Sequence, residues 1–408
     1  MPVKPLEGIR ILDFTQFMSG PMCTIMLGDF GAEIIKIENP PAGDATRYGN
    51  VLENEGSSYY AARNRGKKSI VLNMKDPAQK ELFLRMVKTA DAVIENFKPG
   101  TMEKFGITYE VLEKINPKIV YTSITGYGQD GPYAARPAFD PTVEAEAGLM
   151  SINGEEGGKP VKCGAPVADY TGGLVGCIGT LIGIVDAQRT GHGRRVDASM
   201  MDALILMYEN RLATYLKTGV VPKACGNRYP GASPIGDFMC RDGVPLMINI
   251  GTDEQFKNFA AALDQLQWLE NPKFASLSRR AQNYVEMEAE VTRVFAMYDS
   301  DELIEKLQAH KCVYGKINDF KRLAEHPQVK HRGMIVDAVY PNGVTFKVPG
   351  NPVHMSGMER DTEYKTVPLG YNTFEVLSEV ADEEELHRIF DPVMEQVEKT
   401  GKEKFSKA

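Results

Sequence analysis

Short apolar runs and longer amphipathic stretches alternate along the first part of the chain. The runs predict buried strands at residues 9–14, 32–37, 69–72, 92–95 and 119–123. Between them, apolar residues recur every three or four positions at residues 21–30 and 76–90, as in a helix that is buried on one side. This repetition predicts an α/β fold with a parallel sheet covered by helices on both faces.

In sheets of this kind, ligands bind at the carboxyl ends of the strands. The segments that follow the predicted strands, and so the first candidates for a site, are residues 15–20, 38–39, 73–75, 96–100 and 125–131. The turn after the first strand, DFTQFMSGPMC, lacks the G-x-G-x-x-G pattern of dinucleotide-binding proteins. The sequence therefore gives no reason to expect NAD.

A glycine-rich apolar stretch follows Asp169 and predicts a helix over residues 171–188. Its glycines are spaced four, three and four positions apart and share one helical face, namely Gly172, Gly176, Gly179 and Gly183. Each costs about 1 kcal/mol of helix propensity relative to alanine. We expect this face to pack tightly against another helix, with a ligand near the helix start as the alternative.

Beyond residue 200 the pattern changes twice. A long apolar helix is expected at residues 201–219, and a loop rich in Gly, Pro and Asn at residues 220–236 suggests a domain change. A strand at 245–250 and amphipathic helices at 253–310 follow. Residues 333–358 are strand-rich, and residues 382–407 form a charged helical tail.

Composition excludes several classes of protein. The 408 residues carry a net charge of −8, which argues against a nucleic-acid partner. The N-terminus lacks the pattern of a signal peptide, and the apolar run 171–185 is shorter than the ~20 residues of a membrane span. Six dispersed cysteines show no metal spacing, so we expect reduced thiols, no metal site and a cytoplasmic protein.

Several ordered motifs resemble family III CoA-transferases, the group that includes the formyl-CoA:oxalate and carnitine enzymes. They are the opening KPLEGIRILDFTQFMSGPMCTIMLGDFGAEIIKIENPPAGDATR, then KKSIVLNMKDPAQKELF, IENFKPGTMEKFGITYEVLEKINPKIVYTSITGYGQDGPY and GAPVADYTGG. The resemblance implies a Rossmann-like, CoA-binding large domain at residues 1–200 plus 326–408, and a smaller α+β domain at 220–325. It also implies an interlocked homodimer and an acyl-CoA substrate, with no tightly bound cofactor.

Asp169 has two compatible interpretations. Its place before the glycine-rich helix predicts an N-cap, and the resemblance implies that it is the nucleophile. A helix N-terminus stabilises a carboxylate and offers N–H donors to an oxyanion. In the implied mechanism, Asp169 attacks the donor thioester and becomes an aspartyl-CoA thioester, from which an incoming carboxylate takes the CoA.

The resemblance also implies a set of CoA-binding positions that follow the predicted strands. They are Met18, Ser19, Asn39, Leu72, Asn73, Met74, Lys75, Asn96, Phe97, Lys98, Lys104, Phe139 and Asp140. Asn39 departs from the arginine of some relatives, so phosphate contacts could shift to Lys98, Lys104 or residues 65–68. By itself, the basic stretch 65–68 is typical of a solvated surface.

Two other functions remain open. Racemases of the same superfamily need two bases and place a histidine where this chain has Phe139, so racemisation of a 2-methylacyl-CoA is disfavoured. A non-catalytic CoA-binding protein would be favoured if Asp169 were replaced. The acceptor is expected to be a small or medium carboxylic acid, with a 2-hydroxy acid preferred by analogy.

Overall fold

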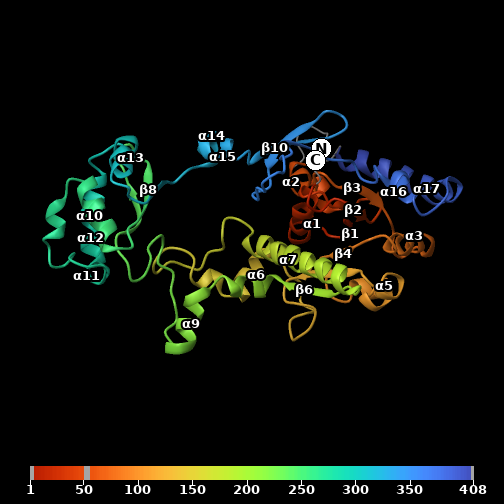
Figure 1. Cartoon of the computed structure of the whole chain (residues 1–408), viewed down its shortest axis with the longest axis horizontal. Helices are drawn as coiled ribbons and strands as arrows, with labels where there is room; N and C mark the ends of the chain where they lie inside the picture. Colours follow the sequence, from red (N-terminus) through yellow and green to blue (C-terminus); the bar gives the residue numbers. More distant parts are fainter. Residues whose placement is uncertain (1–3, 50–55, 406–408) are drawn as a thin grey trace. The chain divides into compact units, whose positions relative to one another are not determined.

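The computed structural model describes residues 4–49 and 56–405, which fold into two compact units (Figure 1). The first unit comprises Met1–Ala147, Cys163–Ala213 and Pro327–Ala408, and the second comprises Gly148–Lys162 and Thr214–His326. Residues 148–162, expected in the large domain, group with the second unit. The CoA-binding role of the larger unit stays a prediction.

Six parallel strands form the main sheet of the first unit, in the order β3-β2-β1-β4-β5-β6. Their bounds are β1 Arg10–Asp13, β2 Glu33–Glu38, β3 Lys68–Val71, β4 Ala92–Glu95, β5 Val120–Thr125 and β6 Arg195–Ser199. The α/β class and the parallel sheet are confirmed. The apolar runs did not predict β6, because it is a half-exposed edge strand with the polar sequence RVDAS.

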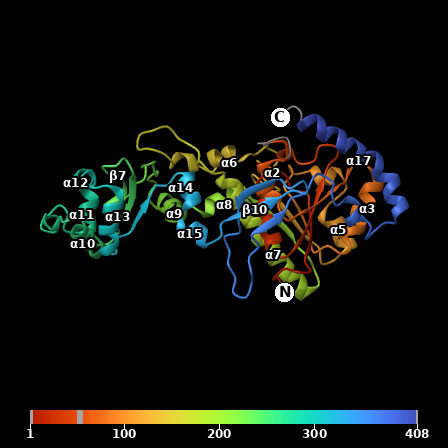
Figure 2. The same cartoon turned by 90° about the horizontal axis from the view of Figure 1, so that it is seen from above.

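Neighbouring residues of β1 enter two separate hydrophobic cores, Ile11 on one face of the sheet and Leu12 on the other. The Ile11 core includes α1 (Ser19–Asp29) and α7 (Val167–Thr190). The Leu12 core includes α3 (Pro77–Val87), α5 (Tyr109–Ile115) and α17 (Glu383–Phe405), and Figure 2 shows α17 on the outer side near α3. Both faces of the sheet are therefore covered, as expected for parallel strands.

The glycine face of α7 packs on the sheet at positions 176, 179 and 183, and the prediction of helix–helix packing holds only at Gly172, which meets the first residue of α8 (Met200–Leu206). A Cβ added at position 176 would lie 2.6 Å from the side chain of Ile124, one at 179 would lie 2.6 Å from Val196, and one at 183 would lie 2.8 Å from Val120. A Cβ at position 172 would lie 2.6 Å from Met200. A second close helix–helix contact is made by Gly173, where a Cβ would meet the backbone oxygen of Ser19 on α1 at 2.4 Å.

The length of α7 corrects a second expectation. The helix has 24 residues and is long and apolar enough to cross a membrane, so the argument from a short run is wrong. Its inward face is nevertheless filled by β5, β6 and α1. We conclude that α7 is a core helix of the α/β unit.

The expected helix at residues 201–219 is divided in two. α8 (Met200–Leu206) ends before Met207, and α9 (Glu209–Thr218) begins at a residue with φ +42°. A positive φ cannot continue a right-handed helix, so the chain changes direction at Glu209.

Shorter elements complete the first unit. The N-terminal part adds η1 (Ala45–Tyr48), α2 (Ser58–Asn64), α4 (Thr101–Lys104) and α6 (Asp140–Glu146). The C-terminal part adds α15 (Pro327–His331), β10 (Ile335–Val339), β11 (Thr345–Pro349), β12 (Glu363–Lys365) and α16 (Thr373–Leu377). β11, β10 and β12 form a small sheet, as the strand-rich pattern at 333–358 predicted in part.

The second unit combines helices with an antiparallel sheet of three strands. The strands are β7 (Ile235–Met239), β8 (Pro245–Asn249) and β9 (Tyr314–Lys316). The helices are η2 (Leu149–Ser151), α10 (Asp253–Ala262), η3 (Leu266–Leu269), α11 (Leu277–Gln282), α12 (Tyr284–Phe295), α13 (Ser300–Ala309) and α14 (Phe320–Glu325). Aromatic residues such as Phe259, Trp268 and Phe295 fill its core.

Candidate active site

A buried network holds the turn between β1 and α1. Asp13, the last residue of β1, accepts hydrogen bonds from the amide (2.8 Å) and hydroxyl (2.5 Å) of Thr15 and pairs with Lys67 at 2.9 Å. Lys36, paired with Asp44 at 3.0 Å, donates to the Thr15 carbonyl at 2.6 Å. The burial of these charges in pairs fixes the turn at the carboxyl edge of the sheet.

Asn96, just after β4, holds the same turn by hydrogen bonds to Gln16 and Ser19. Its Oδ1 accepts from the Gln16 amide at 2.8 Å, and its Nδ2 donates to the Gln16 carbonyl (2.8 Å) and to the Ser19 hydroxyl (3.2 Å). Between them, Phe17 has φ +61°, a strained value for a bulky residue. Its exposed ring lies 6.3 Å from that of Phe139.

Asp169 lies in the first turn of α7, which begins at Val167. The prediction that Asp169 is the N-cap is therefore wrong. The free backbone amides at the start of α7 are bound by Asp140, whose Oδ1 accepts hydrogen bonds from the amides of Ala168 (2.8 Å) and Asp169 (3.3 Å). A buried carboxylate thus stabilises the start of α7 from another helix.

The environment of Asp169 works against its negative charge. Burial and the neighbouring Asp140 raise its pKa to about 6, while hydrogen bonds from the side chain and backbone of Ser19 and the positive charge of Arg63 act in the opposite direction. Asp169 therefore lies between the N-termini of α1 and α7. It remains mostly ionised at neutral pH, and little solvation has to be lost when it attacks.

A cavity of about 350 Å³ opens beside Asp169. Of the predicted positions, those that line it are Met18, Ser19, Asn96, Phe97, Lys98, Phe139 and Asp169. Gln16, Phe17 and Tyr127 also line it, and they lie in the segments 15–20 and 125–131 that follow predicted strands. Sequence reasoning missed Tyr59, Arg136 and Met200, and no sequence signal singled out Tyr59 or Arg136.

The other predicted positions lie outside this lining. Asn39 is exposed after β2, and its Nδ2 donates to the Pro40 carbonyl at 3.0 Å. After β3, Leu72 and Met74 are buried, Asn73 is half-buried and Lys75 is exposed. Lys104 is exposed on α4. Asp140 lies behind Asp169 at the start of α7.

The expectation of a solvated basic surface at residues 65–68 is wrong for two of its members. Arg65 is buried and forms a two-point ion pair with Asp29, one contact being 2.9 Å. Lys67 is buried against Asp13, and burial lowers its pKa to about 8. Since both cations already have carboxylate partners, neither is available for a CoA phosphate.

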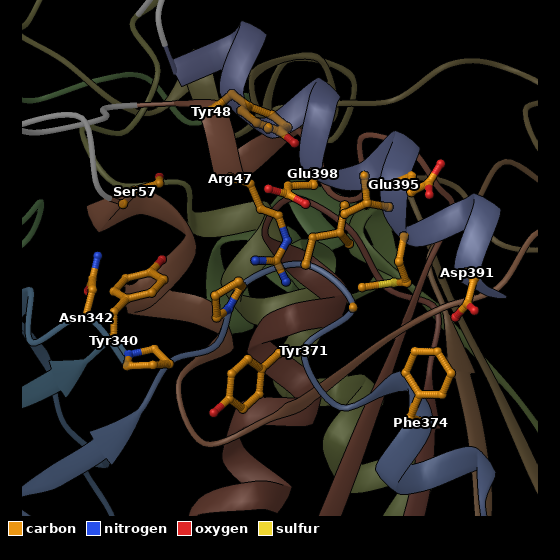
Figure 3. A pocket seen from close by; sticks show the side chains of 18 residues that line it. Arg47, Tyr48, Ser57, Tyr340, Asn342, Tyr371, Phe374, Asp391, Glu395 and Glu398 are labelled. Carbon is orange, nitrogen blue, oxygen red and sulfur yellow. The ribbon is translucent and has the colours of Figure 1, made fainter. Parts of the chain in front are cut away.

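A second cavity in the first unit, of about 840 Å³, shares no lining residue with the first. Figure 3 shows Arg47 and three tyrosines around it, with carboxylates of α17 on one side. Arg47 is ion-paired with Glu38 at 2.5 Å. This cavity is larger, and Ser57 in its lining caps the start of α2, but the Ser57 hydroxyl is already donated to the Thr46 carbonyl at 2.6 Å. We assign the chemistry to the smaller cavity because Asp169 there offers a carboxylate in the first turn of a helix.

Comparison with known proteins gives consistent results. Residues 6–373 match the family model described as CoA-transferase family III. The succinyl-CoA:glutarate CoA-transferase of Homo sapiens is 33% identical over 379 residues, covering 93% of this chain and 86% of that protein. The acetyl-CoA:oxalate CoA-transferase of Acetobacter aceti is 34% identical over 368 residues, covering 90% and 93%.

Solved structures share the fold. The crystal structure of a CAIB/BAIF family protein from Brucella suis superposes with a TM-score of 0.82 at 32% identity, covering 93% of this chain and all (100%) of that one.

Proposed function

Because this chain belongs to CoA-transferase family III, we propose that it moves CoA from an acyl-CoA donor to a small or medium carboxylic acid through a thioester on Asp169. The observation that carries the proposal is the placement of Asp169 in a cavity between two helix N-termini. Preorganised N–H donors at such a place stabilise the oxyanion that acyl transfer forms.

The proposed chemistry needs only the substrates and the carboxylate. An Asp169 oxygen attacks the thioester carbonyl carbon, the C–S bond breaks, and a mixed anhydride and CoA thiolate form. The thiolate then attacks the Asp169 carbonyl and releases the donor acid, leaving an aspartyl-CoA thioester. The acceptor carboxylate reverses both steps and restores free Asp169. The amide and hydroxyl of Ser19, which donate to the carboxylate, are placed to receive the developing negative charge.

We extend the proposal to the path of CoA along the carboxyl edge of the sheet. The strand order brings the ends of β4, β1, β2 and β3 side by side, which supports contacts with Asn96, Phe97 and Lys98, then with residues 72–75 and Asn39. Lys98, Lys75 and Lys104 are exposed and can supply charge to the phosphates. CoA thioesters are the substrates in this scheme, and no resident cofactor takes part.

We also propose that the enzyme is a cytoplasmic homodimer. Leu174, Ile178, Ile182 and Val185 are 38%, 58%, 65% and 54% exposed on α7, and their spacing places them on one face of the helix. A continuous apolar stripe of this kind favours an intersubunit contact. Light scattering on the wild type and on Ile182→Glu tests it, and a monomeric wild type would contradict it.

The relatives that act on glutarate and oxalate support a carboxylic acid acceptor. A panel of acyl-CoA donors with glutarate, oxalate, malate and lactate, scored by product mass, identifies the pair and tests the preference for a 2-hydroxy acid. Phe139 lines the cavity and cannot accept a proton, so no observation favours racemisation. Turnover with no acid in the panel, combined with exchange of an α-proton, would overturn the proposal.

A further inference from the structure

Arg63, on the helix α2 that also carries Tyr59, is held in place by that tyrosine. Its guanidinium carbon lies 4.4 Å from the centre of the Tyr59 ring, and its Nη1 donates to the Tyr59 carbonyl at 3.3 Å. Stacking on an aromatic ring orients the planar group and leaves its remaining donors free to point elsewhere. The side chain is therefore set in one direction before any ligand arrives.

Arg63 differs from its neighbours because it has no acidic partner within the described part of the chain. Arg47 is paired with Glu38, Arg65 with Asp29, and Arg136, the arginine that lines the cavity, with Glu146 at 2.6 Å. The Nε atom of Arg63 is buried and, among the residues described, meets no acceptor. A buried donor without a partner costs about 1–3 kcal/mol. The Nε of Arg65 is unpartnered in the same way, but Arg65 is neutralised by Asp29, whereas the charge of Arg63 has no carboxylate paired with it among the described residues and is available to an anionic ligand.

The position of Arg63 relates it to the reacting carboxylate. Tyr59, on which it stacks, lines the cavity together with Asp169. The positive charge of Arg63 acts on Asp169 and favours its ionised form. A second anion that approaches Asp169 would be repelled by Asp140 and by any charge on Asp169. Arg63, together with Lys98 in the cavity lining, supplies positive charge that can offset this repulsion.

We propose that Arg63 binds the reacting carboxylate of the acid substrate while that acid exchanges with CoA on Asp169. This inference rests on the proposed function. In the step concerned, an oxygen of the acid attacks the carbonyl carbon of the Asp169 thioester, the new C–O bond forms, the C–S bond breaks and CoA leaves as the thiolate. Arg63 holds the acid as an anion before the attack, and its charge also offsets that of the departing sulfur.

The test separates acids from thioesters, because only the free acid brings a negative carboxylate. Steady-state kinetics of Arg63→Gln should show the KM of the acceptor, and the inhibition constant of the donor acid, raised about 10- to 100-fold. The KM of the acyl-CoA should change less than about threefold. Arg63→Lys, which keeps the charge and loses the planar fork, should recover part of the loss. Arg279→Gln, which replaces an exposed arginine on α11 of the second unit, is the matched control and should leave every constant unchanged.

Three results would overturn the proposal. If the KM of the acceptor and the inhibition constant of the donor acid stay unchanged in Arg63→Gln, Arg63 does not bind the acid. A raised KM for acyl-CoA alone would place Arg63 on the CoA phosphates. A loss of affinity confined to dicarboxylic acids would place it on the distal carboxylate. Intact mass spectrometry of the same proteins shows whether the CoA adduct forms on Asp169. An Arg63→Gln protein that forms the adduct but has normal acid constants rejects this inference alone, whereas a wild type without the adduct rejects the proposed function.

Discussion

Replacing Asp140 by asparagine should move the acid limb of the pH–rate profile to lower pH. Asp140 affects Asp169 in two ways. Its negative charge is the second cause, after the burial of Asp169, that raises the pKa of Asp169 to about 6, and its Oδ1 accepts hydrogen bonds from the amides of Ala168 and Asp169. Asparagine keeps an oxygen in the capping position and removes the charge. The variant therefore separates the electrostatic effect from the structural one.

The magnitude follows from the ionised fraction of Asp169. With a pKa of about 6, about one tenth of the carboxylate is ionised at pH 5 and about nine tenths at pH 7. If the pKa fell to its ordinary value of 3.8, almost all of it would be ionised at pH 5. Asp140→Asn can therefore raise kcat/KM at pH 5, relative to pH 8, by at most about tenfold over the wild-type ratio. Since burial remains, the gain should be smaller than this ceiling.

The assay is kcat/KM for the acyl-CoA donor between pH 4.5 and 8.5, with thermal melts to confirm folding. Asp130→Asn removes an exposed carboxylate in the loop after β5 and should keep the acid limb of the wild type. Asp140→Ala should lose about 1 kcal/mol or more of stability with the cap, whereas Asp140→Asn should lose less. An acid limb in Asp140→Asn that stays at the wild-type pH, or moves up, would refute this account of the site.

Three further outcomes are expected. Burial raises the pKa of Glu95 from 4.5 to about 7, so the folded protein loses stability as the pH rises from about 4.5 through 7. In urea unfolding, Glu95→Gln should therefore be up to about 3 kcal/mol more stable than the wild type at pH 8 and close to it at pH 4.5. Gly173→Ala should lower the free energy of unfolding by about 2–3 kcal/mol in the same assay, because the added Cβ would lie 2.4 Å from the Ser19 backbone oxygen. Gly401→Ala, whose added Cβ meets open space, should raise it by up to about 1 kcal/mol. With Phe139 in the cavity, an enantiopure 2-methylacyl-CoA should keep its α-proton in deuterated solvent by proton NMR; rapid exchange would favour a racemase.

Local patterns predicted the sheet because each central strand carries its own apolar signal. Ile11 and Leu12 are buried on opposite faces of β1, so β1 appears in the sequence as a continuous apolar run. The polar edge strand β6 gives no such signal. Its position depends on pairing with β5, whose residues lie 74 positions earlier in the chain, as in the pair Tyr121 and Arg195.

The site was less predictable because its contacts join distant parts of the chain. Asp169 seemed to be an N-cap because nothing in its own segment shows that Asp140, 29 positions earlier, occupies that role. The basic stretch at 65–68 looked solvated because the carboxylates that bury Arg65 and Lys67 lie on α1 and β1. The resemblance to a family identified the nucleophile candidate, but it did not indicate Tyr59 or Arg63.

The most direct test of the account is to trap the covalent intermediate. The enzyme is incubated with acyl-CoA without an acceptor, treated with hydroxylamine, and analysed by peptide mass spectrometry. Hydroxylamine cleaves thioesters, so we expect a hydroxamate on Asp169, inactivation only when acyl-CoA is present, and neither in Asp169→Ala. A label on Cys163, six residues upstream, or full activity in Asp169→Ala, would contradict the assignment of Asp169 as the nucleophile.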